Sequence, residues 1–322
     1  MLDVSRFYRA AALLPLLGAL MTTPAAAQKL AVSLGTATPG GGFPVYGEAF
    51  AAALNEADDG LDVQPRNTKG STENVPLLEA GQLDLALVQG EVAHEALAGI
   101  GRAPASLRVV AAMYSTAGMF VVRADSPYRA IEDLRGKPVA FGARGSGLVV
   151  LAQYVLDGLG LSRDRDFQPI LLDRAGDGPA MVLDGRAAAL WGGGVGWPGF
   201  AAVARDPGGA HFLVPDAAGI QRIRSKHPFL RELTVPAGSY PGQAAALASV
   251  GSWSFVMARP SLPDDVAYRL ARALHRGEGA LAKRLPAAAE TTLANTAAAA
   301  PRAELIHPGV LRYLREIGLA RP

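Results

Sequence analysis

Residues 69–89 read KGSTENVPLLEAGQLDLALVQ and decide the fold class of this chain. Gly70 and Ser71 are expected to open a helix, which ends at Glu79-Ala80-Gly81. The apolar run 83–88 is typical of a buried strand, and Gln89 places an amide at the C-terminal tip of that strand. A helix start rich in small polar residues beside a polar strand end is how α/β proteins hold small anions without chemistry. This stretch therefore predicts a binding protein rather than an enzyme.

Strands and helices alternate on both sides of this stretch, which predicts parallel sheets built from right-handed βαβ units. Two helices are expected at 46–55 and 148–159, and an Ala-rich helical tail at 264–319. The runs Gly118–Arg123 and Val250–Met257 resemble each other, and each is followed by Arg and a Pro-marked turn. We expect them to carry the chain twice across a hinge between two Rossmann-like lobes. Further strands are expected at 29–34, 61–66, 107–113, 139–141, 168–172, 187–191 and 211–214.

Composition limits the classes of function. The chain has 322 residues, of which 50% are apolar and 19% charged, so it can bury the cores of two lobes. It contains no Cys, which excludes disulfides, thiol catalysis and Cys-based zinc sites. The formal net charge is +2 and no basic stripe with interleaved aromatic residues occurs, so nucleic acid is not an expected partner.

The N-terminus has the pattern of a secretory signal peptide. Arg6 and Arg9 form a positive region, an apolar run follows at 10–20, and Ala25-Ala26-Ala27 is a small-residue cleavage site. We expect cleavage after residue 27 and, given the Ala/Gly/Arg-rich style of the chain, a periplasmic location. An uncleaved anchor stays open as an alternative.

Several matches to catalytic or cofactor motifs are weak. Gly194-Val-Gly196-Trp-Pro-Gly199 satisfies G-x-G-x-x-G, but it lies mid-chain and Pro198 favours a helix start over a pyrophosphate loop. Ser146 lies in G-S-G rather than in a nucleophile elbow, and no histidine pair has metal-ligand spacing. We expect no cofactor and no metal. Glu91, close after Gln89, is expected in the first turn of a helix, where its charge is favourable.

Polar turns follow several expected strands at their C-terminal ends, where open α/β sheets bind ligands. Ser71 and Ser146 would each stand at a helix N-terminus, whose free N–H groups attract a carboxylate. Arg144 would add a planar, two-pronged donor. Thr36 and Thr38 follow the first strand, as Gln89 follows the third. Together these residues predict a pocket for a small carboxylate.

Three blocks of sequence resemble the TAXI-type solute receptors of TRAP transporters. They are G35-T-A-T-P-G-G-G-F-P-V-Y-G47, residues 68–89, and D133-L-R-G-K-P-V-A-F-G-A-R-G-S-G147. The resemblance implies a periplasmic receptor of the type II binding-protein fold, which closes on a small carboxylate and hands it to a membrane permease. The resemblance implies ligand-lining positions at Thr36, Thr38, Ser71, Asn74, Gln89, Tyr114, Ser146 and Gly147. We also expect Phe43, Arg144 and Trp191 among the ligand-binding residues.

The chain also departs from the pattern of that family. Gly42-Phe43 replaces a tyrosine pair, the segment Tyr114-Ser-Thr-Ala117 lacks its acidic residue, and Leu148 replaces a threonine. An α-amino group would lose its acidic partner in such a pocket. We therefore expect a ligand smaller or more apolar than glutamate, such as a simple carboxylate or a keto-acid.

The expected organisation is a signal peptide at 1–27, a first lobe of 28–118 and 253–322, and a second lobe of 119–252, in a monomer. Three alternatives stay open. The receptor of an ABC importer would share the fold and the pocket. A secreted hydrolase would use Ser146 as its nucleophile, with His211 and Asp173 as conceivable partners. A sensor domain would pass its ligand state to a membrane kinase.

Overall fold

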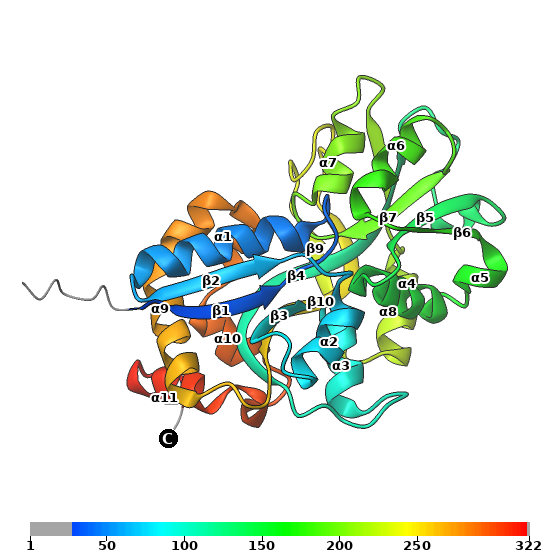
Figure 1. The fold of residues 1–322 in the computed structure, drawn as a ribbon. Coiled ribbons are helices and arrows are strands. Elements are labelled where there is room, and N and C mark those ends of the chain that lie inside the picture. Colours follow the sequence, from blue (N-terminus) through cyan, green and yellow to red (C-terminus); the bar gives the residue numbers. More distant parts are fainter. Residues whose placement is uncertain (1–27, 321–322) are drawn as a thin grey trace, which may run out of the picture.

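The computed structural model describes residues 28–320 and shows two α/β bodies side by side (Figure 1). In the body that we call the first lobe, β1 pairs in parallel with β2 and with β3. Three helices connect these strands and the ones that follow. Their bounds are β1 (Leu30–Gly35), α1 (Gly42–Ala57), β2 (Leu61–Arg66), α2 (Ser71–Glu79), β3 (Leu85–Val88) and α3 (Gly90–Ala98).

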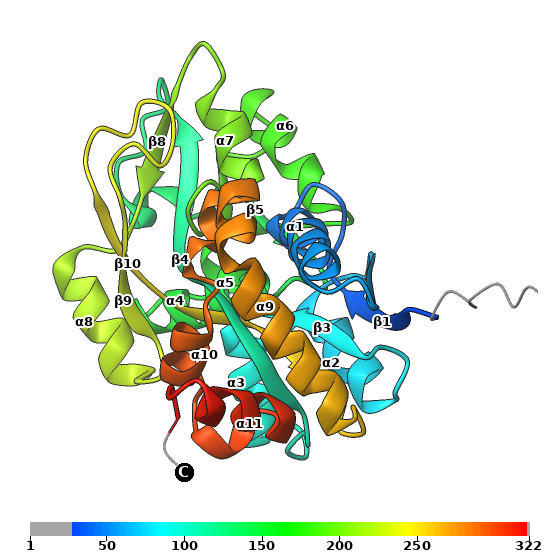
Figure 2. The same ribbon diagram turned by 90° about the vertical axis from the view of Figure 1, so that its left-hand side faces the viewer.

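Two long antiparallel strands, β4 (Arg108–Arg123) and β10 (Leu247–Ala258), run through both bodies (Figure 2). The prediction of separate strands at 107–113 and 118–123 was wrong, because the polar segment between them stays extended. Ser115 and Ala117 in that segment pair with Trp253 and Gly251 of β10, which keeps the backbone in the sheet. The β10 strand reaches β3 at one end and β9 at the other.

In the second lobe, β5 lies between β6 and β7 and pairs in parallel with both. The far half of β4 pairs antiparallel with β7 and β8. Strand β9 was not predicted, because its charged residues Arg231 and Glu232 interrupt the apolar pattern that would indicate a strand. The bounds are β5 (Pro138–Ala143), α4 (Gly147–Gly158), α5 (Arg163–Asp166), β6 (Gln168–Leu172), α6 (Gly178–Leu183), β7 (Ala189–Gly193), α7 (Pro198–Ala204), β8 (Ala210–Leu213), α8 (Ala217–Lys226) and β9 (Arg231–Val235).

Each lobe has its own hydrophobic cores. Those of the first lobe combine residues from the start of the chain, such as Phe50, with Leu274 and Leu314 from its end. Those of the second lobe extend from Ala117 to Val250. The C-terminal helices α9 (Asp264–Arg284), α10 (Leu293–Ala299) and α11 (Pro308–Glu316) therefore complete the first lobe.

The Ala-rich segment 287–300 is a packed element that braces β4. The hydroxyl of Thr291 donates to the carbonyl of Met113 at 2.6 Å, and the hydroxyl of Thr296 accepts from the amide of Ala112 at 3.0 Å. Both threonines are buried. The segment thus holds the first-lobe half of the strand that continues into the second lobe.

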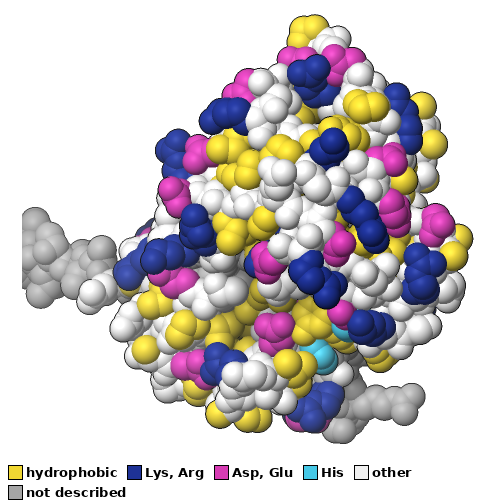
Figure 3. Space-filling model, turned by 90° about the vertical axis from the view of Figure 1, so that its right-hand side faces the viewer, with side chains coloured by type: hydrophobic (Ala, Val, Ile, Leu, Met, Phe, Trp, Pro, Cys, Tyr) yellow, Lys and Arg dark blue, Asp and Glu magenta, His cyan; other side chains and the backbone are white. Residues whose placement is uncertain are grey.

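The α/β fold with two lobes and two connecting strands confirms the predicted fold class. None of the helices in residues 28–320 is long and apolar enough to span a membrane. On the face shown in Figure 3, Lys and Arg side chains lie interspersed with Asp and Glu, so no patch of one sign dominates it.

Candidate functional site

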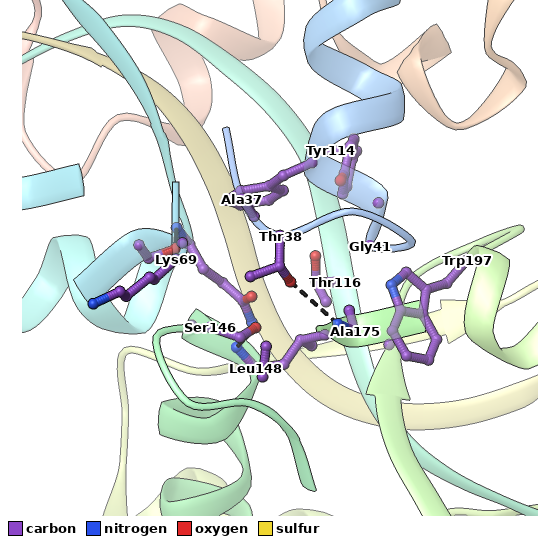
Figure 4. Close-up of a pocket in the computed structure, with 18 residues that line it drawn as sticks. Ala37, Thr38, Gly41, Lys69, Tyr114, Thr116, Ser146, Leu148, Ala175 and Trp197 are labelled. Atoms are coloured by element: carbon purple, nitrogen blue, oxygen red, sulfur yellow. Dashed lines mark hydrogen bonds between the residues drawn. The ribbon is translucent and has the colours of Figure 1, made fainter. Parts of the chain in front are cut away.

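A cavity of about 50 Å³ lies between the two lobes, at the C-terminal ends of β1, β3, β5 and β7 (Figure 4). This volume exceeds the ~10–15 Å³ that one water needs, so the cavity has room for more than one water molecule. Glycine, hydroxyl and aromatic residues predominate in its wall. The lining residues are Ala37, Thr38, Gly41, Gly42, Phe43, Lys69, Gly70, Ser71, Gln89, Tyr114, Thr116, Ala143, Ser146, Gly147, Leu148, Ala175, Gly193 and Trp197.

The first-lobe wall is built around Gln89, which follows β3. The hydroxyl of Ser71, the first residue of α2, accepts a hydrogen bond from the backbone N–H of Gln89 at 3.0 Å. Gln89 is only 3% exposed, and its Nε2 has no hydrogen-bond partner in the described chain. This nitrogen is closed off from open space and lies next to the Glu91 carboxyl, whereas Oε1 of Gln89 lies beside Gly147 of the second lobe.

The second-lobe wall is the N-terminus of α4. Ser146 caps this helix, since its hydroxyl accepts the N–H of Leu148 at 3.2 Å. The helix dipole and the free N–H groups of the first turn favour an anion at this end. Ser146 and Gly147 thus present a positive helix end opposite Gln89.

Three aromatic residues, Phe43, Tyr114 and Trp197, line the other end of the cavity. Figure 4 shows Tyr114 and Trp197 on the side remote from Lys69 and Ser146. Trp197 ends the turn after β7, with Pro198 opening α7 as the sequence indicated. The hydroxyl of Tyr240 accepts the backbone N–H of Trp197 at 3.0 Å, which fixes the turn.

The lobes are in direct contact around the cavity, so this is a closed conformation. Thr38 of the first lobe accepts the N–H of Ala175 of the second at 3.1 Å (Figure 4). The carbonyl of Gly145 accepts both the N–H and the hydroxyl of Thr72, at 3.2 and 3.1 Å. These contacts involve Gly145, Thr38 and Thr72, whose small size lets the two walls approach closely.

Within the described part of the chain, no Asp or Glu lines the cavity, and the one lining cation faces outward. The side chain of Lys69 is 78% exposed and lies 3.9 Å from Glu73. In Figure 4 its amine points away from the other labelled side chains. The cavity therefore relies on neutral donors and helix dipoles.

The structure places Arg144 outside the cavity, in contrast to its expected role as a ligand-binding donor. Its side chain is 68% exposed, and its Nε lies 3.6 Å from Oδ1 of Asp173. The backbone N–H of Arg144 bonds to Leu172 at the end of β6, so the side chain projects into solvent instead of toward Ser146.

Three other expected site residues lie behind the walls. Asn74 is fully buried and donates to the carbonyls of Thr36 and Leu87, both at 2.8 Å, which ties the ends of β1 and β3 together. The hydroxyl of Thr36 donates a hydrogen bond to the backbone carbonyl of Arg66 at 3.1 Å. Trp191 lies in the second-lobe core and donates to the carbonyl of Leu148 at 2.8 Å.

The misplacement of Trp191 has a geometric cause. The sequence was expected to end this strand at residue 191, whereas β7 continues to Gly193, so Trp191 is a mid-strand core residue. The tryptophan at the cavity is Trp197, which sequence reasoning missed although it lies in the quoted turn 194–199. Thr116 was missed as well, inside the quoted segment 114–117. Seven expected residues do line the cavity: Thr38, Phe43, Ser71, Gln89, Tyr114, Ser146 and Gly147.

Glu91 lies in the first turn of α3, as expected, but it is fully buried rather than solvated. Its Oε1 accepts the hydroxyl of Ser252 on β10 at 2.7 Å, and its Oε2 has no partner among the described residues. Burial raises the pKa of this carboxyl to about 7. A titratable group thus sits beside the connecting strand.

A family comparison matches residues 34–318, nearly all of the described chain, to the NMT1-like family. The chain belongs to the NMT1-like family. This NMT1-like protein resembles, among solved structures, the periplasmic aliphatic sulphonate binding protein SsuA from Escherichia coli. The two share 20% identity over 91% of this chain and 84% of that one, with a TM-score of 0.50.

A second similar structure is MatC from Rhodopseudomonas palustris, solved with bound malate. It shares 15% identity with the NMT1-like chain over 90% of this chain and 96% of MatC, with a TM-score of 0.56. Identities this low establish a common fold. The fold is that of periplasmic solute-binding proteins, as the sequence predicted.

Proposed function

We propose that this NMT1-like protein is a periplasmic solute receptor, which captures a small carboxylate between its lobes and delivers it to a TRAP-type membrane permease. The observation that carries this proposal is the interlobe cavity, in which the buried side chain of Gln89 lies opposite the N-terminus of α4. A side-chain amide and a positive helix end match the hydrogen-bonding atoms and the charge of a carboxylate.

The lining residues also support the kind of carboxylate. Because no acidic residue among residues 28–320 lines the cavity, an α-amino group would lose its water without gaining a charged partner. Amino acids are therefore expected to bind more weakly than keto-acids or unsubstituted carboxylates of the same length. Sulphonates, which the E. coli relative binds, and malate, which occupies MatC, belong in the same comparison.

The proposed mechanism is closure of two lobes about β4 and β10. The moving parts would be residues 28–118 with 253–322 and residues 119–252, joined only by these strands. A ligand can stabilise the closed form only through contacts that it loses on opening. Gln89 and Ser71 on one lobe and Ser146 and Gly147 on the other supply such contacts, because each pair stays with its own lobe.

The geometry around Ser146 weighs against hydrolysis. The hydrogen bond of its hydroxyl is to the N–H of Leu148, and no histidine in residues 28–320 bonds to it. A serine nucleophile needs a base within hydrogen-bond reach. An importer receptor of the ABC class would share this pocket, and the genes beside this one distinguish it: two membrane permeases for TRAP, an ATPase for ABC.

The test is a thermal-shift screen of the secreted protein against amino acids, keto-acids, dicarboxylates and sulphonates. A ligand at 100 times its Kd should stabilise the protein by about 2.7 kcal/mol. Stoichiometric stabilisation by carboxylates, abolished in Gln89→Leu, is the expected result. Turnover of generic esters that disappears in Ser146→Ala, or the absence of any stabilising carboxylate, would contradict the proposal.

A further inference from the structure

The aromatic end of the cavity holds two hydrogen-bonding atoms that the protein does not use. The hydroxyl of Tyr114 and the indole N–H of Trp197 both lack a hydrogen-bond partner in the described chain, and both residues line the cavity. Other such groups nearby are satisfied: Tyr46 bonds to Thr291, and Trp191 bonds to Leu148. The two unsatisfied groups therefore stand out from their neighbours.

Gly42 leaves open the space between these two groups. A Cβ atom at this position would lie 3.4 Å from the Tyr114 hydroxyl oxygen and 3.7 Å from Nε1 of Trp197. The same Cβ would lie 3.2 Å from Cδ1 of Trp197. A side chain at position 42 would therefore stand between the two groups, and glycine leaves the space next to them open.

A second cavity, also of about 50 Å³, begins at the same point. Gly42, Tyr114, Gly193 and Trp197 line both cavities, so the two cavities adjoin at these residues. The second cavity continues along apolar residues, among them Val195 and Leu285.

Both donors are fixed in place before any ligand arrives. The ring of Trp197 fills the positions where Gly192 and Gly199 would carry a Cβ, at 2.4 and 2.3 Å. The ring of Tyr114 packs edge-on against Tyr46, with centroids 5.4 Å apart. Groups held rigidly lose little entropy on binding, so hydrogen bonds made here count nearly in full toward affinity.

We infer that Tyr114 and Trp197 form a distal subsite, which receives an oxygen atom of the ligand at the end remote from its carboxylate. This inference rests on the proposed function, because the carboxylate end is the one bound by Gln89 and α4. The oxygen belongs to a carbonyl, a hydroxyl or a second carboxylate, all of which accept hydrogen bonds. Gly42 determines the specificity, because a side chain at this position would block the approach of the oxygen to both groups.

The test compares matched compounds by isothermal titration. Pentanoate lacks the distal oxygen, whereas 4-oxopentanoate carries a carbonyl and succinate a carboxylate at the corresponding carbon; hexanoate, 5-oxohexanoate and glutarate repeat the comparison one carbon longer. In the wild-type protein an oxygen-bearing compound should bind about 3- to 10-fold tighter than its alkanoate. Tyr114→Phe should remove most of that ratio, and Gly42→Ala should remove it entirely.

Tyr46→Phe is the matched control, because it deletes a tyrosine hydroxyl that is satisfied inside the first lobe. It should lower the melting temperature and leave the ratio between oxo-acid and alkanoate unchanged. A ratio near one in the wild-type protein, or a ratio that survives both Tyr114→Phe and Gly42→Ala, overturns the subsite alone. A wild-type protein that binds none of the six compounds overturns the carboxylate site, and the subsite with it.

Discussion

Gly147 of the second lobe lies directly against the side chain of Gln89 of the first. A Cβ atom built on Gly147 would be 2.5 Å from Cβ of Gln89 and 2.9 Å from the hydroxyl of Ser71. Real Cβ atoms do not approach other atoms so closely, so a side chain here forces the two walls apart. The glycine is thus required by the closed conformation rather than by the helix that it begins.

Gly147→Ala should therefore weaken ligand binding without unfolding either lobe. Overpacking of this kind costs about 1–3 kcal/mol, which corresponds to a loss of roughly 5- to 150-fold in affinity. Titration calorimetry measures the affinity, and small-angle scattering should show that added ligand no longer compacts the variant. An unchanged Kd in Gly147→Ala would mean that the ligand-bound form is not the closed form described above.

Arg144→Ala should change the affinity for a carboxylate by less than about 2-fold, because the arginine is exposed and paired with Asp173. Gln89→Leu should lose roughly 10-fold or more, since a hydrogen bond to a charged group contributes about 1.5–3 kcal/mol. The two variants are compared by titration at equal salt. If Arg144→Ala proves the more damaging, the ligand lies nearer β6 than the cavity does.

Stability should fall as the pH rises from 5 to 8, through the buried Glu91. Its pKa is about 7 in the folded protein against 4.5 for an unperturbed glutamate, so the folded state binds the proton more tightly. The stabilisation is complete below the unfolded pKa and is lost as the pH passes the folded pKa.

Glu91→Gln keeps an acceptor for Ser252 and cannot ionise, so it isolates this effect. Urea unfolding at pH 5 and pH 8 should show a smaller pH dependence in the variant than in the wild-type protein. At pH 8 the variant should be the more stable of the two, by about 1 kcal/mol or more. A pH dependence equal in both proteins would show that Glu91 does not titrate in this range.

Gly279→Ala should stabilise the protein by about 0.5–1 kcal/mol, because this glycine lies inside α9 and a Cβ there meets no atom within 4 Å. Gly277, two residues earlier, is the matched contrast: its Cβ would lie 3.1 Å from the carbonyl oxygen of Ala53. Gly277→Ala should gain less or lose stability, as thermal unfolding in the absence of ligand would show. Equal gains at both positions would contradict this packing between α1 and α9.

The sequence predicted the elements where local signals agree and failed where distant partners decide. Strand β2 has the bounds expected for it, because apolar alternation and turn residues mark both of its ends. The polar segment 114–117 looked like a break between two strands, since nothing local shows that β10 pairs along its whole length. The burial of Glu91 could not be predicted either. Its position in the first turn of a helix does not indicate that the hydroxyl of Ser252, which is distant in the sequence, hydrogen-bonds to it.

The candidate site divides in the same way. Gln89 and Ser146 could be found because strand ends and helix starts leave their polar groups at one edge of a sheet. Arg144 and Trp191 were assigned to the cavity on their residue type, whereas the direction of each side chain depends on the register of β5 and β7. Because β7 ends two residues later than predicted, Trp191 lies inside the strand, and the tryptophan that lines the cavity is Trp197 in the turn that follows. The division into lobes at residues 118 and 252 stays a prediction about which parts move together.

The course of the chain through its two lobes also determines an order of assembly. The second-lobe cores are built from residues 117–250, one uninterrupted stretch, and need nothing that comes later. The first-lobe core joins Phe50 to Leu314, so the N-terminal hundred or so residues lack their partners until the last helix has been made. During synthesis from the N-terminus, the second lobe can complete its cores before the first lobe does. The N-terminal part of the first lobe therefore stays exposed longest to proteases and chaperones.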